Sequence, residues 1–396
     1  MPPGLVLPGV FNEIVIHSAV IAEAVGKPFD RRPPTADYGA CLDYHGVATA
    51  IPLSTGRRRF ATLSSVPPMH ELFDRGDRDR FEAVAASGTT VGSAGLGHRA
   101  LALAASARGG SADAAVELSA LWLHAAVAAP ASLVAVYDAS ATGWLGNPPD
   151  ASPISMPIAS RVQVPDEFWP AFWSLVFDPQ AGQNASEITV RTAALTGMLS
   201  PELADHLVAS SACYPGVGAA AADGFPVQFT LPALARCPKG SLGGDLHDLI
   251  VDNNFDLEVL DRDALGLAGL PAPLDYVNAR ILQCHDLWHL LAGYRTTVLH
   301  EIAISGFQMA QFGHHYSSLF LATVATKVSL TQPLGVALIF DTILSAYVHG
   351  RETPPLLGFP WEEIWDSSAD EIRSSRGVRT YASPYPADLF EQLQSA

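Results

Sequence analysis

The pattern of apolar and polar positions is clearest in the second half of the chain, where it predicts helices. Ser200, Pro201 and Glu202 provide an N-cap residue, a proline suited to the first helical position and an early acid, which together predict a helix through about residue 210. Gly350 is expected just past the C-terminus of the last predicted helix. The other predicted helices span 274–294, 299–312, 317–330 and 333–349. This half of the chain is therefore predicted to be an all-α bundle.

The first half of the chain gives a weaker pattern. Residues 81–136 are rich in Ala, Val and Leu and are typical of packed helices. Within them, the uncharged stretch 118–137 reaches the length of a membrane span. His124 and Pro130 interrupt that stretch, and it has no flanking Lys or Arg anchor. We therefore expect a buried helix that ends near Pro130.

A proline-rich segment predicts the domain organisation. Five prolines with interspersed Gly and Ser make 139–165 a predicted linker between an unassigned N-terminal domain, 1–138, and an all-α domain, 166–396. Short β-branched runs at 45–53 and 59–66 are consistent with a small sheet. The predicted fold class is therefore mainly α, with an N-terminal domain that is α-rich or, as the alternative, α+β.

Charge and cysteine content exclude several classes of partner and site. The chain has 23 Lys and Arg against 40 Asp and Glu, a net charge of −17, so it lacks the basic face that binds nucleic acid or anionic membranes. Peripheral membrane contact would have to rest on exposed apolar surface. The four cysteines form no C-x-x-C pair, which predicts neither a disulfide framework nor a thiolate zinc site and fits a reducing, cytoplasmic setting. Homo-oligomerisation stays open, because one sequence does not show which apolar faces are covered.

Seven of the 13 histidines lie between residues 247 and 349, and two of them form the sharpest motif. His285 and His289 are four residues apart, so their imidazoles project from one face of a helix and can bind one metal ion. Glu301 would lie roughly 120° away from His289 on an unbroken helix. We therefore predict a helix break at 292–297 that returns Glu301 to the site. Asp286 either completes the ligand set or orients an imidazole from outside it.

The helix that carries Glu301 adds a polar stripe. Ser305, Gln308, Phe312 and His315 all lie within about 40° of Glu301 around the predicted helix axis. Imidazole and carboxylate ligands without thiolate suit Zn, Fe or Mn, so we predict a divalent metal without choosing among them. Three or four protein ligands leave open positions, which favours a catalytic site. The alternative is a set of hydrogen-bonded core residues.

The motif H-D-L-W-H, eleven residues and E, over 285–301, resembles the metal motif of the coenzyme Q biosynthesis protein four family, which acts in ubiquinone synthesis. Further segments resemble family signatures in the same order, and the resemblance covers about 165–378. The first 160 residues match no segment of that family, whose members are shorter, which leaves a different substrate or partner open. The supporting segments are 238–243 with 254–256, 350–357, 361–365 and 371–373.

The resemblance implies an all-α fold, an apolar groove for a polyprenyl tail, and a metal held by His285, Asp286, His289 and Glu301. It also implies oxidative decarboxylation of a prenylated hydroxybenzoate, in which a hydroxyl replaces the carboxylate at ring carbon one. Other quinone-biosynthesis enzymes are the implied partners, and the periphery of the inner membrane is the implied location.

Three further residues are candidates for catalysis, and two other functions stay open. Arg351 is the candidate to bind the substrate carboxylate or a ring oxygen, and a surface ion pair with Glu352 or Asp341 is its alternative. His315 and Gln308 are candidate acid–base groups or supports for the metal ligands, and core hydrogen bonds are their alternative. The chain could instead be a lipid-binding scaffold with a structural metal, or a tailoring enzyme of another pathway with the same metal site.

Overall fold

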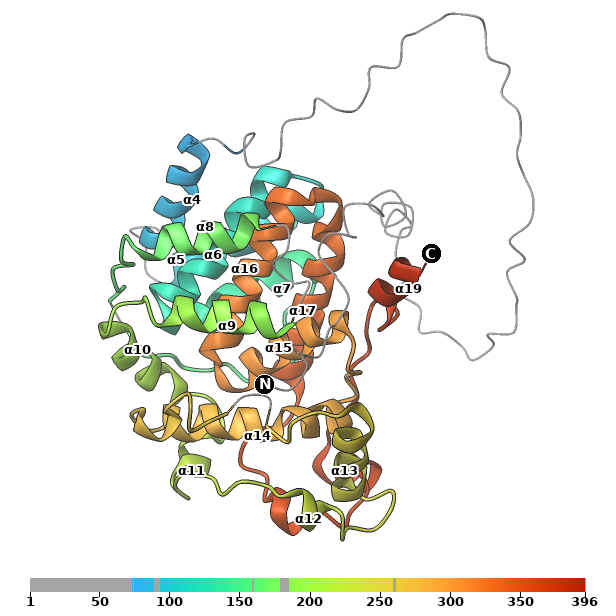
Figure 1. Ribbon diagram of the computed structural model, residues 1–396. Helices are drawn as coiled ribbons and strands as arrows, with labels where there is room; N and C mark the ends of the chain where they lie inside the picture. Colours follow the sequence, from blue (N-terminus) through green and yellow to red (C-terminus); the bar gives the residue numbers. More distant parts are fainter. Residues whose placement is uncertain are drawn as a thin grey trace, which may run out of the picture.

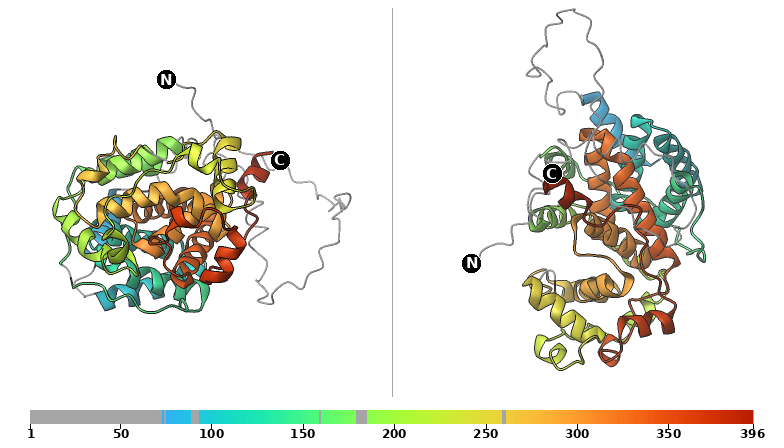
Figure 2. Two further views of the ribbon diagram at one scale, coloured as in Figure 1. Left: turned by 90° about the horizontal axis from the view of Figure 1, so that it is seen from below. Right: turned by 90° about the vertical axis from the view of Figure 1, so that its right-hand side faces the viewer.

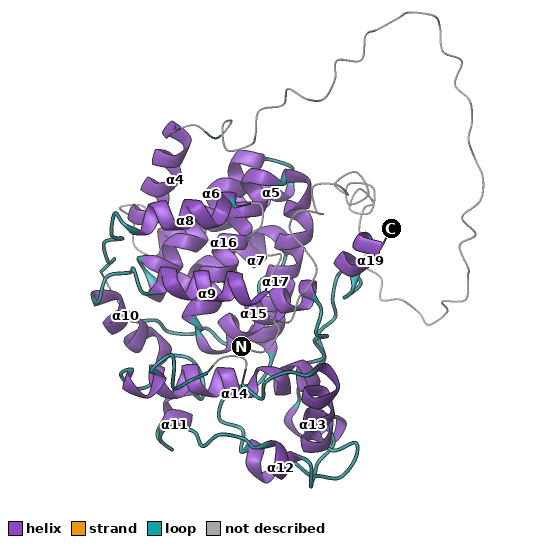
Figure 3. Ribbon diagram, viewed as in Figure 1, coloured by secondary structure: helices purple, strands orange, loops and turns teal. Residues whose placement is uncertain are grey.

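The computed structural model describes residues 73, 75–88, 93–158, 160–178, 185–258 and 261–395. The regular elements in these ranges are all helical, without a strand among them (Figure 3). The predicted mainly α fold class is confirmed. The runs predicted as a small sheet, 45–53 and 59–66, lie outside the described residues.

The helices fall on either side of the proline-rich segment. Those before it are α4 (Arg75–Ser87), α5 (Ser93–Arg108), α6 (Ala112–Val127) and α7 (Leu133–Leu145). Those after it are α8 (Phe168–Phe177), α9 (Ala185–Thr196), α10 (Glu202–Ser211), α11 (Val217–Ala221), α12 (Leu231–Leu234), α13 (Leu242–Asn253), α14 (Leu274–Ala292), α15 (Val298–Phe312), α16 (His315–Thr331), α17 (Val336–Glu352), α18 (Ala369–Arg376) and α19 (Leu389–Ser395). Short 3-10 turns are η1 (Pro130–Ser132), η2 (Leu267–Gly269), η3 (Pro333–Gly335) and η4 (Trp361–Glu363).

A bundle and a smaller layer make up the fold (Figure 1). In the bundle, α5 packs on α7, α15 on α17, α16 on α6, and α17 on α7. Helix α14 lies across one end of the bundle, with α13, α12 and α11 beyond it, as the right-hand view of Figure 2 also shows. Helix α14 contacts α15 of the bundle and α13 and α18 of the smaller layer, so it joins the two parts.

The uncharged stretch 118–137 is part of the protein core. Helix α6 ends at Val127, η1 begins at Pro130, and α7 restarts the chain at Leu133. The side chain of Trp122 in α6 is fully buried. The expectation of a buried helix ending near Pro130 is therefore confirmed.

Among the described residues, one helical segment is long and apolar enough to cross a membrane. It spans Pro333–Glu352, and 67% of its apolar window is buried inside the protein. Its neighbours α15, α16 and α7 cover it, as expected of a core helix.

The two parts of the chain on either side of the predicted linker share one hydrophobic core. Buried apolar side chains form a continuous cluster from Phe81 in α4 to Phe390 in α19. Helix α7 continues to Leu145, so the segment without helix starts at Gly146 rather than at 139. The proline-free sequence before Gly146 allows this extension. The division into domains at 139–165 stays a prediction.

Gly350 has a different role from the predicted one. It was expected to follow a helix C-terminus, but α17 continues through it to Glu352, so that expectation is wrong. A Cβ atom at Gly350 would lie 2.6 Å from the carbonyl oxygen of Phe307 in α15. A Cβ at Gly306 of α15 would likewise lie 2.9 Å from the carbonyl oxygen of Ile343 in α17. Glycine at these positions therefore lets the α15 and α17 backbones approach closely.

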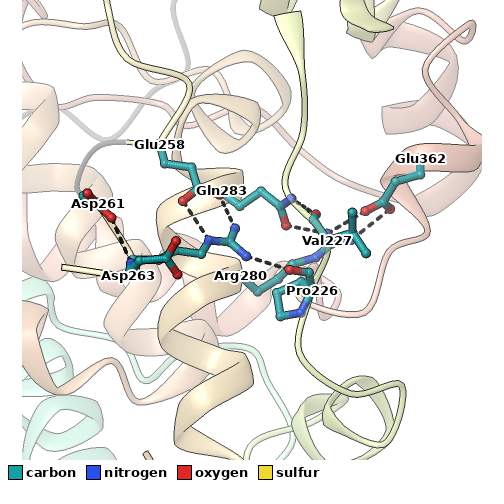
Figure 4. A network of polar contacts seen from close by, with 9 residues as sticks. Pro226, Val227, Glu258, Asp261, Asp263, Arg280, Gln283 and Glu362 are labelled. Carbon is teal, nitrogen blue, oxygen red and sulfur yellow. Dashed lines mark hydrogen bonds and ion pairs between the residues drawn. The ribbon is translucent and has the colours of Figure 1, made fainter. Parts of the chain in front are cut away.

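A polar network fixes the face of α14 opposite His289 (Figure 4). The Arg280 guanidinium donates to the Gln283 side chain at 2.7 Å and to Glu362 at 2.9 Å. Gln283 in turn donates to the Val227 carbonyl at 2.6 Å. Nine residues separate Arg280 from His289, which places them about 180° apart around the helix. The network therefore holds the orientation of α14 while leaving its His289 face for the site.

Candidate metal centre

The predicted helix break is present, and it brings Glu301 back to the histidine pair. Helix α14 ends at Ala292, and Gly293 takes a left-handed conformation with φ of 77° while its N–H donates to the His289 carbonyl. Helix α15 then begins at Val298 and places Glu301 in its first turn. The break at 292–297 is confirmed.

The three predicted side chains converge on one point. The Nε2 atoms of His285 and His289 lie 3.0 Å apart. One carboxylate oxygen of Glu301 lies 3.3 Å from His285 Nε2, and the other lies 3.3 Å from His289 Nε2. Asp286 joins them, because its carboxylate and the two imidazoles offer ligand atoms that all lie within 4.8 Å of one another.

Exposure differs sharply across this cluster. The side chain of His289 is 2% exposed, that of His285 is 17% exposed, and that of Glu301 is 44% exposed. The cluster is therefore closed at His289 and open to solvent beside Glu301. A site that is open beside Glu301 can admit a ligand or substrate from solvent. A structural metal site, by contrast, is normally closed.

The charges of the cluster depend on one another. Burial alone would raise the pKa of the Glu301 carboxyl, but the charges of His289 and His285 and their hydrogen bonds hold that pKa well below its usual range. Burial alone would lower the pKa of His289, and the Glu301 carboxylate reverses this and raises it. Burial raises the pKa of Asp286 despite the neighbouring imidazoles. The Glu301 carboxylate is therefore the negative charge that interacts with both imidazoles.

Each imidazole is held from its far side. The Nδ1 atom of His289 lies 3.2 Å from the Tyr294 carbonyl oxygen, so Nδ1–H donates and Nε2 faces the cluster. The Nδ1 atom of His285 lies 2.7 Å from the Gln308 side-chain amide. Such outer contacts fix the ring orientation of metal-binding histidines. Gln308 is thus the one residue of the three catalytic candidates that contacts a candidate ligand within the described part of the chain.

These residues fit a divalent cation. Two imidazole Nε2 atoms and carboxylate oxygens are ligands for Zn, Fe or Mn, and the donor set does not select among them. Separations of 3.0 and 3.3 Å are those expected for atoms bound to one ion at about 2.0–2.2 Å. Asp286 offers a carboxylate oxygen within 4.8 Å of the imidazole ligand atoms, so it can either complete the ligand set or orient an imidazole from outside it. That these residues bind a metal stays a prediction.

Arg351 lies outside the cluster. Its Nε donates to Asp138 of α7 at 3.0 Å, and its Nη2 donates to the Ser152 carbonyl at 3.1 Å. The alternatives named from the sequence, Glu352 and Asp341, are not its partners among the described residues. Asp138 precedes Arg351 by 213 positions, so local spacing gave no signal for this pair.

His315 also lies outside the stripe predicted from helical spacing. Gly313 ends α15 in a left-handed conformation, with φ of 64°, and His315 opens α16. The expectation that His315 shares a helical face with Glu301 is therefore wrong. Its Nε2 donates to the Ala126 carbonyl at 3.0 Å, and burial lowers its pKa to about 4. It is thus a neutral hydrogen-bond donor to the end of α6.

The candidate metal centre lies in a part of the chain that matches a known protein family. Residues 227–382 match the family model described as coenzyme Q (ubiquinone) biosynthesis protein Coq4. All four candidate ligands lie inside that match. Residues 227–382 belong to the Coq4 family. The family suggested by the HDLWH motif is therefore confirmed, and the family match begins at 227, so 165–226 lie outside it.

Individual relatives agree with this assignment over part of their length. The mitochondrial ubiquinone biosynthesis protein COQ4 of Eremothecium gossypii is 28% identical over 123 residues, which are 30% of this chain and 36% of the relative. The human mitochondrial COQ4 homolog is 26% identical over 154 residues, which are 37% of this chain and 54% of the relative. The chain thus matches between about a third and just over half of the length of these curated relatives.

A solved structure is also similar. It is described as a putative ubiquinone biosynthesis protein from Nostoc punctiforme and is 25% identical in sequence, with a TM-score of 0.42. The alignment covers 54% of this chain and 97% of that one.

Proposed function

We propose that the Coq4 domain of this chain is a metal-dependent enzyme of ubiquinone biosynthesis that acts on a prenylated hydroxybenzoate. The observation that carries the proposal is the convergence of His285, His289 and Glu301, with ligand atoms 3.0 and 3.3 Å apart, inside the region that matches the family. The names of the relatives, which are ubiquinone biosynthesis proteins, support the pathway.

The residues of the cluster have separate tasks in this proposal. His289, anchored by the Tyr294 carbonyl, and His285, contacted by Gln308, would present their Nε2 atoms to the cation. Glu301 would bind the same cation from the solvent-exposed side, where the substrate approaches. Asp286 would add an oxygen ligand from the buried side.

The proposed reaction is an oxidative decarboxylation. The bond between ring carbon one and the carboxyl carbon breaks, the carboxyl group leaves as CO₂, and a hydroxyl forms on the same ring carbon. With O₂ as oxidant, the balance requires two electrons and two protons from an external reductant, and the second oxygen atom leaves as water. A bound redox-active cation would supply substrate coordination and oxygen activation, whereas zinc would supply Lewis acidity alone.

The open side of the site favours catalysis over a purely structural metal. Structural metal sites are normally closed to solvent, and here the side chain of Glu301, itself a candidate ligand, is 44% exposed. Quinone-biosynthesis enzymes as partners, a peripheral membrane location and a homo-oligomer stay predictions. The two relatives described above are named as mitochondrial, while the cytoplasmic setting expected from cysteine content also stays a prediction.

The test combines metal analysis with turnover. The full chain, purified without chelator, is compared with His289→Ala and Glu301→Ala, and His247→Ala serves as a control because His247 pairs with Asp248 outside the cluster. About one Fe or Mn per chain, lost in the two site variants and kept in the control, is expected. Formation of CO₂ and the hydroxylated product from a prenylated hydroxybenzoate, with O₂ and a reductant, completes the expected result.

Two outcomes would contradict the proposal in different ways. A bound metal without any turnover of prenylated hydroxybenzoates would leave a lipid-binding scaffold or another tailoring reaction as the function. Metal content unchanged in both site variants would show that the cluster does not bind it.

A further inference from the structure

A line of buried hydrogen bonds leads away from His285 through three helices. The Gln308 amide in α15 contacts His285 Nδ1 at 2.7 Å. Ser317 in α16 donates its hydroxyl to the Gln308 carbonyl oxygen at 3.4 Å. The Nδ1 atom of His314, at the start of α16, lies 2.9 Å from the Ser317 hydroxyl. Gln308, Ser317 and His314 are each at most 9% exposed.

Capping of α16 does not account for these contacts. His314 is the N-cap residue of α16, but its side chain makes no capping hydrogen bond to the helix. Its side-chain partner is the Ser317 hydroxyl, and the contacts of Ser317 with Gln308, and of Gln308 with His285, connect it across α15 to the candidate ligand.

Every group along the line can both donate and accept. An amide has a donor end and an acceptor end of nearly the same shape, and a hydroxyl and a neutral imidazole each do both. Burial, reinforced by the neighbouring imidazoles of His315 and His285, lowers the pKa of His314 to about 3, so His314 is neutral near pH 7. The line can therefore run in either of two directions.

The direction in the structure leaves a proton on the ligand side of His285. Ser317 donates to the Gln308 side-chain oxygen, and the Gln308 NH₂ group faces His285 Nδ1, which therefore accepts. Because the Ser317 hydroxyl proton is used in that bond, the contact with His314 requires His314 Nδ1–H to be the donor. The His285 proton is then on Nε2, 3.0 Å from His289 Nε2. A cation on His285 Nε2 requires the opposite arrangement, with the proton on Nδ1 and an acceptor facing it.

We propose that Gln308, Ser317 and His314 form a reversible hydrogen-bond line that sets which nitrogen of His285 is free, and that a cation on His285 reverses the line. On reversal the Gln308 amide turns its oxygen to His285 Nδ1–H, its NH₂ group donates to Ser317, and Ser317 donates to His314 Nδ1. His285 and His314 each lose one proton and gain one on the other nitrogen, so neither changes charge. The inference rests on the proposed metal site. Gln308, Ser317 and His314 are positioning residues.

The test follows the tautomers of two histidines in the full chain. Protein with ¹⁵N-labelled histidine is titrated with Zn²⁺, which is diamagnetic, and the ¹⁵N shifts of His285 and His314 report which nitrogen carries the proton. The signals are assigned with His285→Ala and His314→Asn. We expect both residues to switch tautomer together as Zn²⁺ binds, although His314 does not contact the ion.

Variants separate the line from simple packing. Ser317→Ala removes the middle link, so Zn²⁺ should still bind while the His314 tautomer no longer responds. Ser318→Ala is the matched control, because the Ser318 hydroxyl donates to the His315 carbonyl and is not part of the line. Gln308→Met should lower Zn²⁺ affinity about 10-fold or more, as expected when an outer partner of a ligand is lost, and Gln308→Glu, which keeps an acceptor for His285 Nδ1–H, should restore binding.

The outcomes distinguish this inference from the proposed function. Zn²⁺ binding to wild-type protein with an unchanged His314 tautomer would overturn the line and leave the metal site intact. A response of His314 that persists in Ser317→Ala would overturn it as well. Failure of Zn²⁺ to bind at all would overturn the metal site and the inference together.

Discussion

Arg351 of α17 and Asp138 of α7 form an ion pair across the proline-rich segment, with Arg351 Nε 3.0 Å from Asp138 Oδ1. The hydroxyl of Tyr347 donates to the same carboxylate at 2.8 Å. The Arg351 side chain is 5% exposed. The Coq4 domain is therefore joined by partly buried polar contacts, in addition to apolar ones, to a helix that precedes it in sequence.

Removal of Asp138 should destabilise the protein through the charge left on Arg351. We expect Asp138→Ala to lower the free energy of unfolding by about 3 kcal/mol, because a buried guanidinium would lose its counter-ion. Urea unfolding measures the change. The control is Asp370→Ala, because the Asp370 side chain beside Arg373 is 91% exposed, so its effect should stay below about 1 kcal/mol. Equal effects of the two variants would contradict a structural role for the Arg351 pair.

The close approach of α15 and α17 gives a second prediction. Gly350→Ala would place a methyl group against the Phe307 carbonyl, and we expect it to lower the free energy of unfolding by about 1–3 kcal/mol. Gly218→Ala is the control, since a Cβ there meets no atom within 4 Å, and it should be neutral or stabilising by about 0.4–1 kcal/mol. Thermal or urea unfolding compares them. A Gly350→Ala variant as stable as Gly218→Ala would rule out the tight contact.

The parts of the fold that the sequence predicts well are those governed by local spacing. The His285 and His289 pair shares one helical face because four residues complete about one turn. The helix break before Glu301 was predicted because Glu301 would lie about 120° from His289 on an unbroken helix. Gly293, with its positive φ, ends the first helix at this break. The role of Gly350 was misjudged because a glycine inside a helix and one beyond its end look alike until the neighbouring helix is known.

The parts that the sequence does not predict depend on contacts between distant segments. Asp138 reaches Arg351 only after α7 packs on α17. His315 falls off the Glu301 stripe because Gly313 turns the chain before it. The contacts of His314 and Ser317 with Gln308 likewise form across the turn between α15 and α16. Neither hydropathy nor residue spacing carries that three-dimensional information.

His315 should make stability depend on pH. Its pKa is lowered from 6.5 to about 4 by burial, so between these values the unfolded chain binds more protons than the folded one. Its contribution to stability is therefore complete above about pH 6.5 and is lost as the pH falls towards 4. As the pH falls from 6.5 towards 4, we expect the free energy of unfolding to decrease faster in the wild-type protein than in His315→Gln. The difference between the two slopes should reach up to about 1.4 kcal/mol per pH unit.

The comparison of these two proteins isolates the histidine. Glutamine can still donate to the Ala126 carbonyl but does not titrate. Urea unfolding at intervals between pH 4 and 8 gives the two profiles, which should be parallel above about pH 7. Parallel profiles over the whole range would show that His315 is protonated without penalty in the folded protein.

Cation binding should stabilise the folded chain through Glu301. A ligand that binds the folded state alone at 100 times its dissociation constant raises the free energy of unfolding by about 2.7 kcal/mol. We expect this gain for wild-type protein with Zn²⁺ or Mn²⁺, and we expect a chelator to reverse it. The gain should be smaller in Glu301→Gln, because this variant loses the charged carboxylate that lies beside both imidazoles. Because this substitution also changes the metal-free cluster, each protein is compared with itself with and without the cation. Glu363→Gln, an exposed position in η4, should keep the full gain. An equal gain in Glu301→Gln would place the cation elsewhere on the chain.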